Sequence, residues 1–125
     1  MQQVTWYMDG RIVYAQVEGE TLTRQRLHAL DTALAPFLGH SALSDVHVVI
    51  DASGVKTVHP DVLSARLDYV SDAQLGWNVL IAPDALANYL EPLLMPVNGG
   101  FCSFTSLEEG LFFLEDEDET LLMPS

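Results

Sequence analysis

The chain has 125 residues, a usual size for one domain and long enough to bury a hydrophobic core without disulfides. Its 18 acidic and 5 basic side chains give a formal charge of −13 at pH 7, so its field repels nucleic acid and anionic lipid. We therefore expect no nucleic acid partner. No run of about 18 apolar residues predicts a membrane span and no signal peptide pattern is present, so we expect a cytoplasmic protein.

Five of the acidic residues form one run, residues 115–119. Subtracting these five charges from −13 leaves −8 for residues 1–114, which contain no repeat or linker. We predict a single domain over residues 1–114 and an acidic C-terminal tail over residues 115–125. A run of like charges is typical of a solvated or disordered end, and the alternative is a segment that docks on a basic partner.

The first half of the chain predicts a β-hairpin, a helix and a central strand. Residues 4–8 and 11–17 are rich in β-branched and aromatic side chains, and Asp9-Gly10 between them favours a two-residue turn. Leucines at helical spacing predict a helix over residues 21–38. Residues 46–50 are nearly all apolar, which is typical of a strand covered on both faces.

Beyond residue 60 the alternation of helices and strands continues. Residues 61–72 carry a helical stripe of apolar residues that only Arg66 interrupts, and another helix follows residue 83. Residues 77–82 and 101–104 predict strands, and a last helix follows them. The order ββαβαβαβα predicts an α/β fold with a five-stranded mixed sheet, an N-terminal β-hairpin and about four helices.

Two features of the last helices are specific enough to compare with a structure. Pro92 lies inside the helix expected after residue 83, and because proline removes a backbone hydrogen bond it predicts a kink or break near residues 90–91. Thr105 and Glu108 match a capping box at the start of the final helix.

No constellation in the sequence predicts catalysis. His59 and Asp61 lie in a loop before a helix, where α/β proteins commonly hold functional groups, but a loop residue and a helix cap explain them equally. Cys102 is the only cysteine and lies in an apolar strand, so we expect a buried structural thiol. The four histidines lack the spacing of a metal site. We expect no enzyme activity, no cofactor and no metal.

The string VHVVIDASGVKTVHPDVL, residues 46–63, resembles the central segment of the STAS domains, the fold of the anti-sigma factor antagonists. Residues 6–13, 75–77 and 105–111 are similar to the divergent SpoIIAA-like branch of that superfamily. The resemblance implies a STAS-like α/β fold and a bacterial regulatory domain that binds a protein partner. It also implies that the loop and helix start after the third strand form the contact surface.

In the regulated members of the family a serine in that loop is phosphorylated. Residues 59–62 align with the loop here and Asp61 takes the place of the serine, so the usual phospho-acceptor is missing. One carboxylate carries less charge than a phosphate and imitates it only weakly. The residues expected to contact the partner are Ser53, Gly54, His59, Asp61 and Ser64.

The resemblance to the SpoIIAA-like branch also implies a second possible function, because some members of that branch are similar to the SEC14-like lipid-binding fold. It is the carriage or sensing of a small apolar ligand beneath the third helix. That helix is more apolar than a narrow core stripe requires, so it either packs in the core or borders a groove or a dimer surface. The exposed edge strand of the hairpin is a second feature that makes a homodimer an option. The residues expected to border the ligand are Tyr89, Leu93, Leu94 and Met95.

Overall fold

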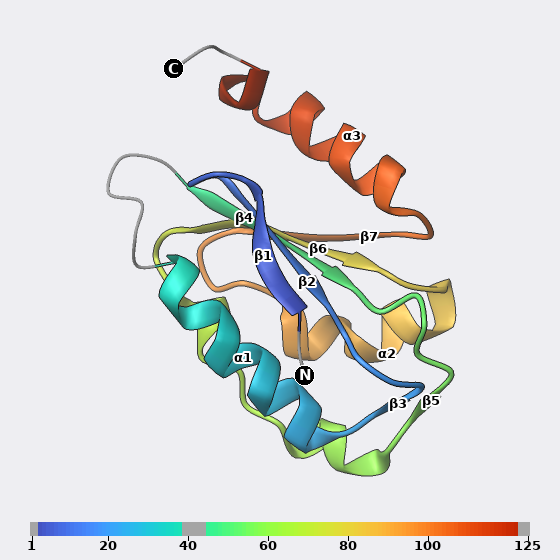
Figure 1. Cartoon of the computed structure of the whole chain (residues 1–125). Helices are drawn as coiled ribbons and strands as arrows, with labels where there is room; N and C mark the ends of the chain where they lie inside the picture. The colour runs from blue at the N-terminus through green and yellow to red at the C-terminus, as the bar shows by residue number, and fades with distance from the viewer. Residues whose placement is uncertain (1–2, 39–44, 123–125) are drawn as a thin grey trace.

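A computed structural model describes residues 3–38 and 45–122 of the chain. They form an α/β fold around a five-stranded mixed sheet (Figure 1). In the order of the sheet, its strands are β1 (Gln3–Met8), β2 (Ile12–Gln16), β4 (Val46–Asp51), β6 (Leu75–Ile81) and β7 (Gly100–Phe104). β1 is antiparallel to β2, and every other neighbouring pair is parallel. The predicted α/β class, five-stranded mixed sheet and N-terminal hairpin are confirmed.

The turn of the hairpin has three residues rather than the expected two. Met8 pairs with Ile12 across the hairpin, and the N–H of Arg11 donates to the carbonyl of Met8 at 2.9 Å. Gly10 has a φ of +74°, which glycine adopts without strain. A shift of register between Trp6 and Met8 accommodates the additional residue.

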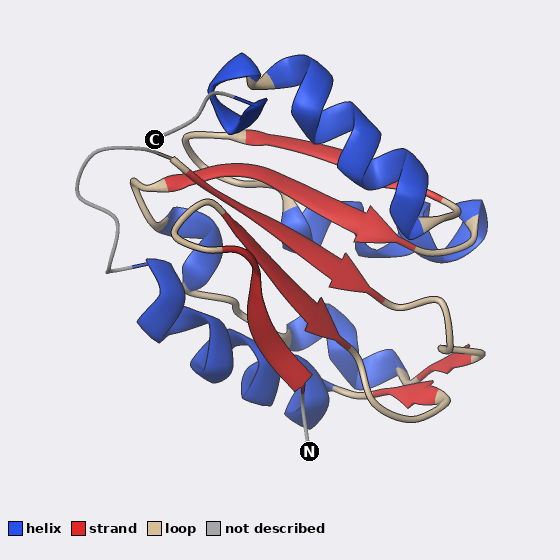
Figure 2. Ribbon diagram, turned by 45° about the horizontal axis from the view of Figure 1, so that its top comes forward, coloured by secondary structure: helices blue, strands red, loops and turns tan. Residues whose placement is uncertain are grey.

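Helices cover the sheet on both faces (Figure 2). α1 (Arg24–Leu38) and α2 (Asp84–Leu94) lie on one face and bury the larger core cluster, whereas α3 (Leu107–Glu117) covers the other face. β4 is therefore buried on both faces, as its apolar sequence predicts. Among the residues that the structure describes, no helix is long and apolar enough to cross a membrane.

The helix expected over residues 61–72 is wrong. The segment instead forms two short 3-10 helices, η1 (Pro60–Ser64) and η2 (Tyr69–Ser71), and Ala65 after η1 is extended. Two further strands, β3 (Thr21–Leu22) and β5 (Thr57–Val58), pair in a small parallel sheet that the sequence did not predict.

Asp31 of α1 explains why the segment is not one helix. Its carboxylate accepts hydrogen bonds from the backbone N–H of Asp68 at 3.0 Å and of Tyr69 at 2.8 Å. These amides are therefore satisfied by a side chain from another helix instead of by the carbonyls one turn earlier. The contact also satisfies Asp31, which is buried.

α2 continues through Pro92 to Leu94, so the expected break near residues 90–91 is wrong. Pro92 lies two residues before the end of the helix and removes only one hydrogen bond there. The next turn still closes, because the N–H of Met95 donates to the carbonyl of Glu91 at 3.1 Å.

The capping box expected from Thr105 and Glu108 is also wrong, because the cap lies one residue later. The Oγ of Ser106 accepts a hydrogen bond from the N–H of Glu109 at 3.2 Å and donates to the carboxylate of Glu109 at 3.1 Å. Thr105 reaches only the same carboxylate, at 3.4 Å. Ser106 is thus the N-cap of α3.

The acidic run belongs to the layer that covers the sheet. Residues 115–117 extend α3, the 3-10 helix η3 (Glu119–Leu122) follows, and Leu121 is buried in the smaller core cluster. The fold therefore continues past residue 114 to residue 122. The end of the expected tail, residues 123–125, lies outside the described residues.

Candidate functional site

An open pocket of about 590 Å³ lies where the first turns of α1 meet η1 and the residues that follow it. Asp61 and Ser64, two of the residues expected to contact a partner, line this pocket. Arg24, His28 and Arg66 line it as well, and sequence reasoning had not selected them. The signal for Arg66 was its charge within an otherwise apolar stripe, whereas Arg24 and His28 had no sequence signal.

Asp61 joins η1 to the start of α1. Its Oδ1 accepts a hydrogen bond from the backbone N–H of Arg24 at 3.0 Å, which satisfies one of the free amides of the first turn. Thr23 caps the same turn, because its Oγ1 accepts from the N–H of Arg26 at 3.2 Å. Ser64 donates its hydroxyl hydrogen to the carbonyl of Asp61 at 2.8 Å. Hydrogen bonds therefore fix this wall of the pocket.

His59 is the N-cap of η1, beside the pocket. Its Nδ1 accepts a hydrogen bond from the N–H of Asp61 at 3.1 Å and lies 3.0 Å from Oδ1 of the same residue. The first contact requires an Nδ1 without hydrogen, whereas the second becomes an ion pair only if the ring is an imidazolium. Both side chains thus act as helix caps, but not as the structural alternative had it: His59, expected as a loop residue, caps η1, and Asp61, expected to cap that helix, caps α1.

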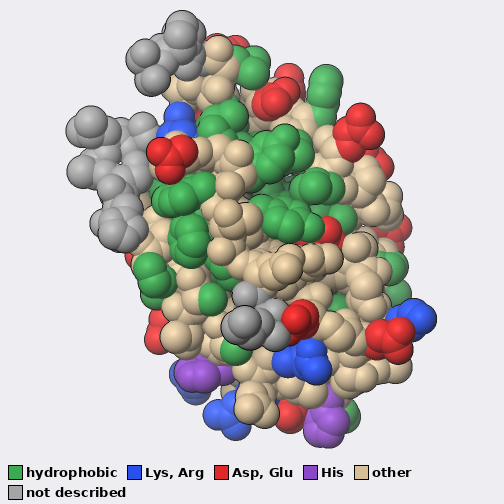
Figure 3. Space-filling view, in the orientation of Figure 1, with side chains coloured by type: hydrophobic (Ala, Val, Ile, Leu, Met, Phe, Trp, Pro, Cys, Tyr) green, Lys and Arg blue, Asp and Glu red, His purple; other side chains and the backbone are tan. Residues whose placement is uncertain are grey.

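Within the described residues, two of the three carboxylates that line the pocket accept hydrogen bonds, whereas the third, Asp68, and the two guanidinium groups make none. Asp31 and Asp61 accept hydrogen bonds from backbone amides, but the side chains of Arg24 and Arg66 make no hydrogen bond or ion pair within residues 3–38 and 45–122. Figure 3 shows Lys, Arg and His side chains gathered at the end of the molecule where α1 begins. The pocket therefore offers two guanidinium groups, beside three carboxylates, that can donate charge-assisted hydrogen bonds to an anionic group.

Ser53 and Gly54 lie elsewhere, in the turn after β4, and do not line this pocket. The N–H and Oγ of Ser53 donate to Oδ1 of Asp51 at 3.0 and 2.6 Å, and the hydroxyl of Tyr14 donates to Oδ2 at 2.6 Å. Burial alone would raise the pKa of Asp51, but these hydrogen bonds outweigh it and lower the pKa. Burial and the Asp51 carboxylate raise the pKa of Tyr14 to about 12. The structure thus divides the expected contact residues between two places.

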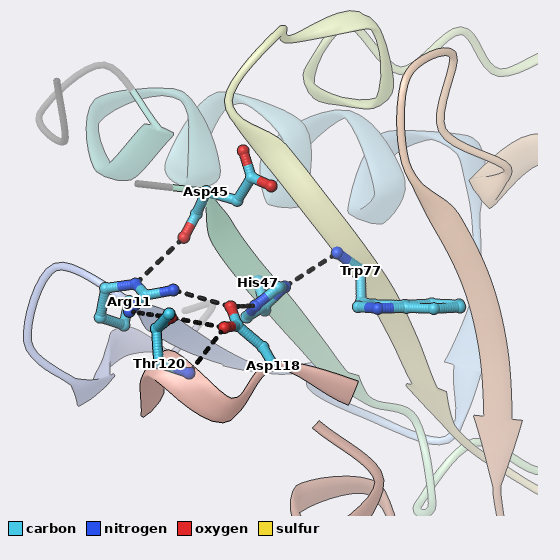
Figure 4. A network of polar contacts seen from close by, with 6 residues as sticks. All are labelled: Arg11, Asp45, His47, Trp77, Asp118 and Thr120. Atoms are coloured by element: carbon cyan, nitrogen blue, oxygen red, sulfur yellow. Dashed lines mark hydrogen bonds and ion pairs between the residues drawn. The ribbon is translucent and has the colours of Figure 1, made fainter. Parts of the chain in front are cut away.

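A third polar cluster attaches the end of α3 to the sheet (Figure 4). His47 is only 2% exposed, and its Nδ1 accepts a hydrogen bond from the N–H of Trp77 at 2.9 Å. The ring hydrogen therefore lies on Nε2, which is 2.8 Å from Oδ2 of Asp118. Gly76 permits this approach, because a Cβ there would lie 2.6 Å from Nδ1 of His47.

Arg11 completes this cluster. Its Nη2 donates to Oδ2 of Asp118 at 2.7 Å, and its Nη1 donates to the hydroxyl of Thr120 at 3.0 Å. Burial alone would raise the pKa of Asp118, but the hydrogen bonds from Thr120 and His47 and the charge of Arg11 lower it to about 2. The cluster joins segments more than 70 residues apart, and each nitrogen of the Arg11 guanidinium contacts the fold itself, so we assign it a structural role.

Two smaller expectations concern cysteine and metals. Cys102 is half-buried in β7, so the expected full burial is wrong, because β7 is an edge strand of the sheet. Within the described residues, no group of three or more His, Cys, Asp or Glu side chains is placed to hold a metal ion.

The four residues expected to border an apolar ligand are split between core and surface. Leu94 is buried, Leu93 packs partly against the core, and Tyr89 and Met95 are exposed. This arrangement gives no specific support to the carrier function, which stays a prediction.

Comparison of the chain with protein-family models, with curated proteins and with solved structures finds no match. The resemblance to STAS domains therefore stays a prediction, and the geometry of the pocket has to carry the functional argument.

Proposed function

We propose that the chain is a non-catalytic regulatory domain of the STAS type that binds a protein partner through the pocket between α1 and η1. The observation that carries this proposal is the presence of two unpaired guanidinium groups, from Arg24 and Arg66, in one pocket with Asp61 and Ser64. The pocket lies just beyond β4, the third strand of the main sheet. The resemblance to STAS domains implies a contact surface in the segment that follows this strand.

The chemistry of the pocket indicates what it would recognise. A guanidinium group binds a carboxylate with two parallel hydrogen bonds, and the guanidinium groups of Arg24 and Arg66 are both available for such a contact. The net charge of −13 repels polyanions such as nucleic acid, whereas a single Asp or Glu on a protein surface can pair directly with the two guanidinium groups, although three carboxylates line the same pocket. We therefore propose a partner that presents a carboxylate to Arg24 and Arg66.

The roles of His59 and Asp61 support a function without catalysis. General acid–base chemistry needs groups aimed at a substrate atom, whereas these two side chains cap η1 and α1. Their contacts are directed at backbone amides of their own fold.

The test begins with a photo-crosslinking amino acid in place of Ser64, used in cells to identify the partner. The affinity of the purified pair is then measured by isothermal titration calorimetry for Arg24→Gln and Arg66→Gln. We expect each substitution to weaken binding by about tenfold or more, because each removes a charged contact of the interface.

Lys56→Gln is the matched control, because it removes one positive charge at the same end of the molecule but outside the pocket. Lys56 forms an exposed ion pair with Glu20 at 3.2 Å, and its loss should change the affinity less than about twofold. Asp61→Asn keeps an oxygen for the α1 cap and separates the charge of Asp61 from its structural role. Unchanged affinity in both arginine variants would refute the proposed pocket. If Lys56→Gln weakened binding as much as the arginine substitutions do, the net charge of the chain and not the pocket would explain the loss of affinity.

A further inference from the structure

The outer surface of α3 and η3 carries an apolar patch, on the opposite face of the sheet from the α1–η1 pocket. Phe112 is 74% exposed and Leu122 is 65% exposed. Both line the same hollow of about 250 Å³, so they form one patch rather than two isolated side chains. Contiguous apolar surface of this kind is typical of an interaction site.

Phe112 stands between two hollows. The second hollow has a volume of about 470 Å³ and is bordered by Phe104 of β7 and Phe113 of α3 as well as by Phe112. The two hollows meet at Phe112 and Asp116, which line both. We call this continuous surface the α3 groove. A partner side chain could pack on either side of the exposed ring.

The rim of the α3 groove is acidic. The carboxylates that line its two hollows belong to Glu108, Glu109, Glu115, Asp116 and Glu119. No Lys, Arg or His occurs in the sequence after Arg66, so the segment that builds the groove brings no positive charge of its own. The acidic side chains over α3 lie at the opposite end of the molecule from the cluster of basic ones (Figure 3).

We infer that the α3 groove binds a basic amphipathic segment of another protein. Its apolar residues would pack against Phe112, and its Lys or Arg residues would pair with the acidic rim. A second copy of this chain docked by the same surface would bring two acidic rims together, and anionic lipid would meet the same repulsion. The inference does not rest on the proposed function, because the two surfaces share no residue.

The test uses a fluorescein-labelled peptide of leucine and lysine, about 14 residues or four helical turns long, and its counterpart with glutamate in place of lysine. Binding to the full chain is measured by fluorescence anisotropy in about 0.1 M salt. We expect the lysine peptide alone to bind. Phe112→Ser should weaken its binding by about tenfold or more, because the exposed ring is the central apolar contact.

Val97→Ser is the matched control, because Val97 is 69% exposed but lies outside the groove. It should change the affinity less than about twofold. Thermal unfolding checks that each variant is folded, and Leu122→Ser repeats the test if Phe112→Ser is not. Binding of the glutamate peptide with equal affinity, an equal loss in Val97→Ser, or no binding of the lysine peptide to the unmodified chain would each overturn the inference.

Discussion

Three buried polar side chains connect separate elements of the fold. Asp31 holds η2 against α1, His47 holds the end of α3 against β4, and Asn78 donates from Nδ2 to the hydroxyl of Tyr69 and the carbonyl of Leu94 at 2.9 and 2.7 Å. A buried polar group without its partner costs about 1–3 kcal/mol. These residues therefore define where the helical segments lie on the sheet.

Substitution of Asp118 is the first prediction at this scale. Asp118→Asn removes the charge that Arg11 and His47 contact, and we expect it to lower the free energy of unfolding at pH 7 by about 1 kcal/mol, a value reduced for partial exposure. The pKa of Asp118 in the fold is about 2, below its ordinary value of 3.8. The stabilisation is therefore present above pH 3.8 and is lost as the pH falls toward 2.

Urea unfolding at a series of pH values measures this effect. The difference between the unmodified chain and Asp118→Asn should be full at neutral pH and vanish below about pH 2. Glu117→Gln is the control, because it removes the same charge from an exposed neighbour and should not destabilise the acidic chain. A difference that does not depend on pH would show that the carboxylate charge is not what stabilises the contact.

Within residues 3–38 and 45–122, α3 is the only α-helix on its face of the sheet. It carries the smaller core cluster, the acidic rim of the α3 groove and, through Asp118, the link to β4. α1 and α2 share the larger cluster on the other face. The position of α3 therefore depends on a small core, on its N-cap and on the contacts of Asp118.

The N-cap of α3 gives the prediction at this scale. Ser106→Ala removes the acceptor for the N–H of Glu109 and should lower the free energy of unfolding by about 1 kcal/mol. Thr105→Ala removes only a longer contact and should have an effect below about 0.5 kcal/mol. Thermal or urea unfolding of the two variants decides between them. A larger effect of Thr105→Ala would restore the capping box that the sequence predicts.

The molecule as a whole is strongly acidic, and its charge is unevenly distributed. Four of its five Lys and Arg residues precede residue 60, and the segment after Arg66 has none. The two proposed interaction surfaces therefore differ, because one combines two guanidinium groups with carboxylates and the other has a rim of carboxylates alone. If both proposals hold, we expect the two surfaces to bind different partners, because they share no residue.

The excess of negative charge leads to a prediction about salt. Raising the salt concentration from about 0.01 M to about 0.1 M shortens the screening length from roughly 30 to 10 Å and weakens repulsion among the carboxylates. We expect the melting temperature to rise by about 3 °C, measured by circular dichroism. A variant with Glu115→Gln and Glu119→Gln should show a smaller rise. A melting temperature that falls with salt would mean that ion pairs outweigh repulsion.

Local sequence patterns were enough to predict the alternation of strands and helices, the opening hairpin and the burial of β4, because periodicity and turn residues act over a few neighbouring positions. The resemblance also predicted Asp61 and Ser64 as contact residues, and the structure shows only that both line one pocket. It took the tertiary structure to show that residues 60–71 form η1 and η2 instead of one helix, since the carboxylate that binds the amides of Asp68 and Tyr69 comes from α1, 37 residues before Asp68. For the same reason it alone brought Arg24 and Arg66 into one pocket: contacts between distant segments are set by packing and leave no local pattern.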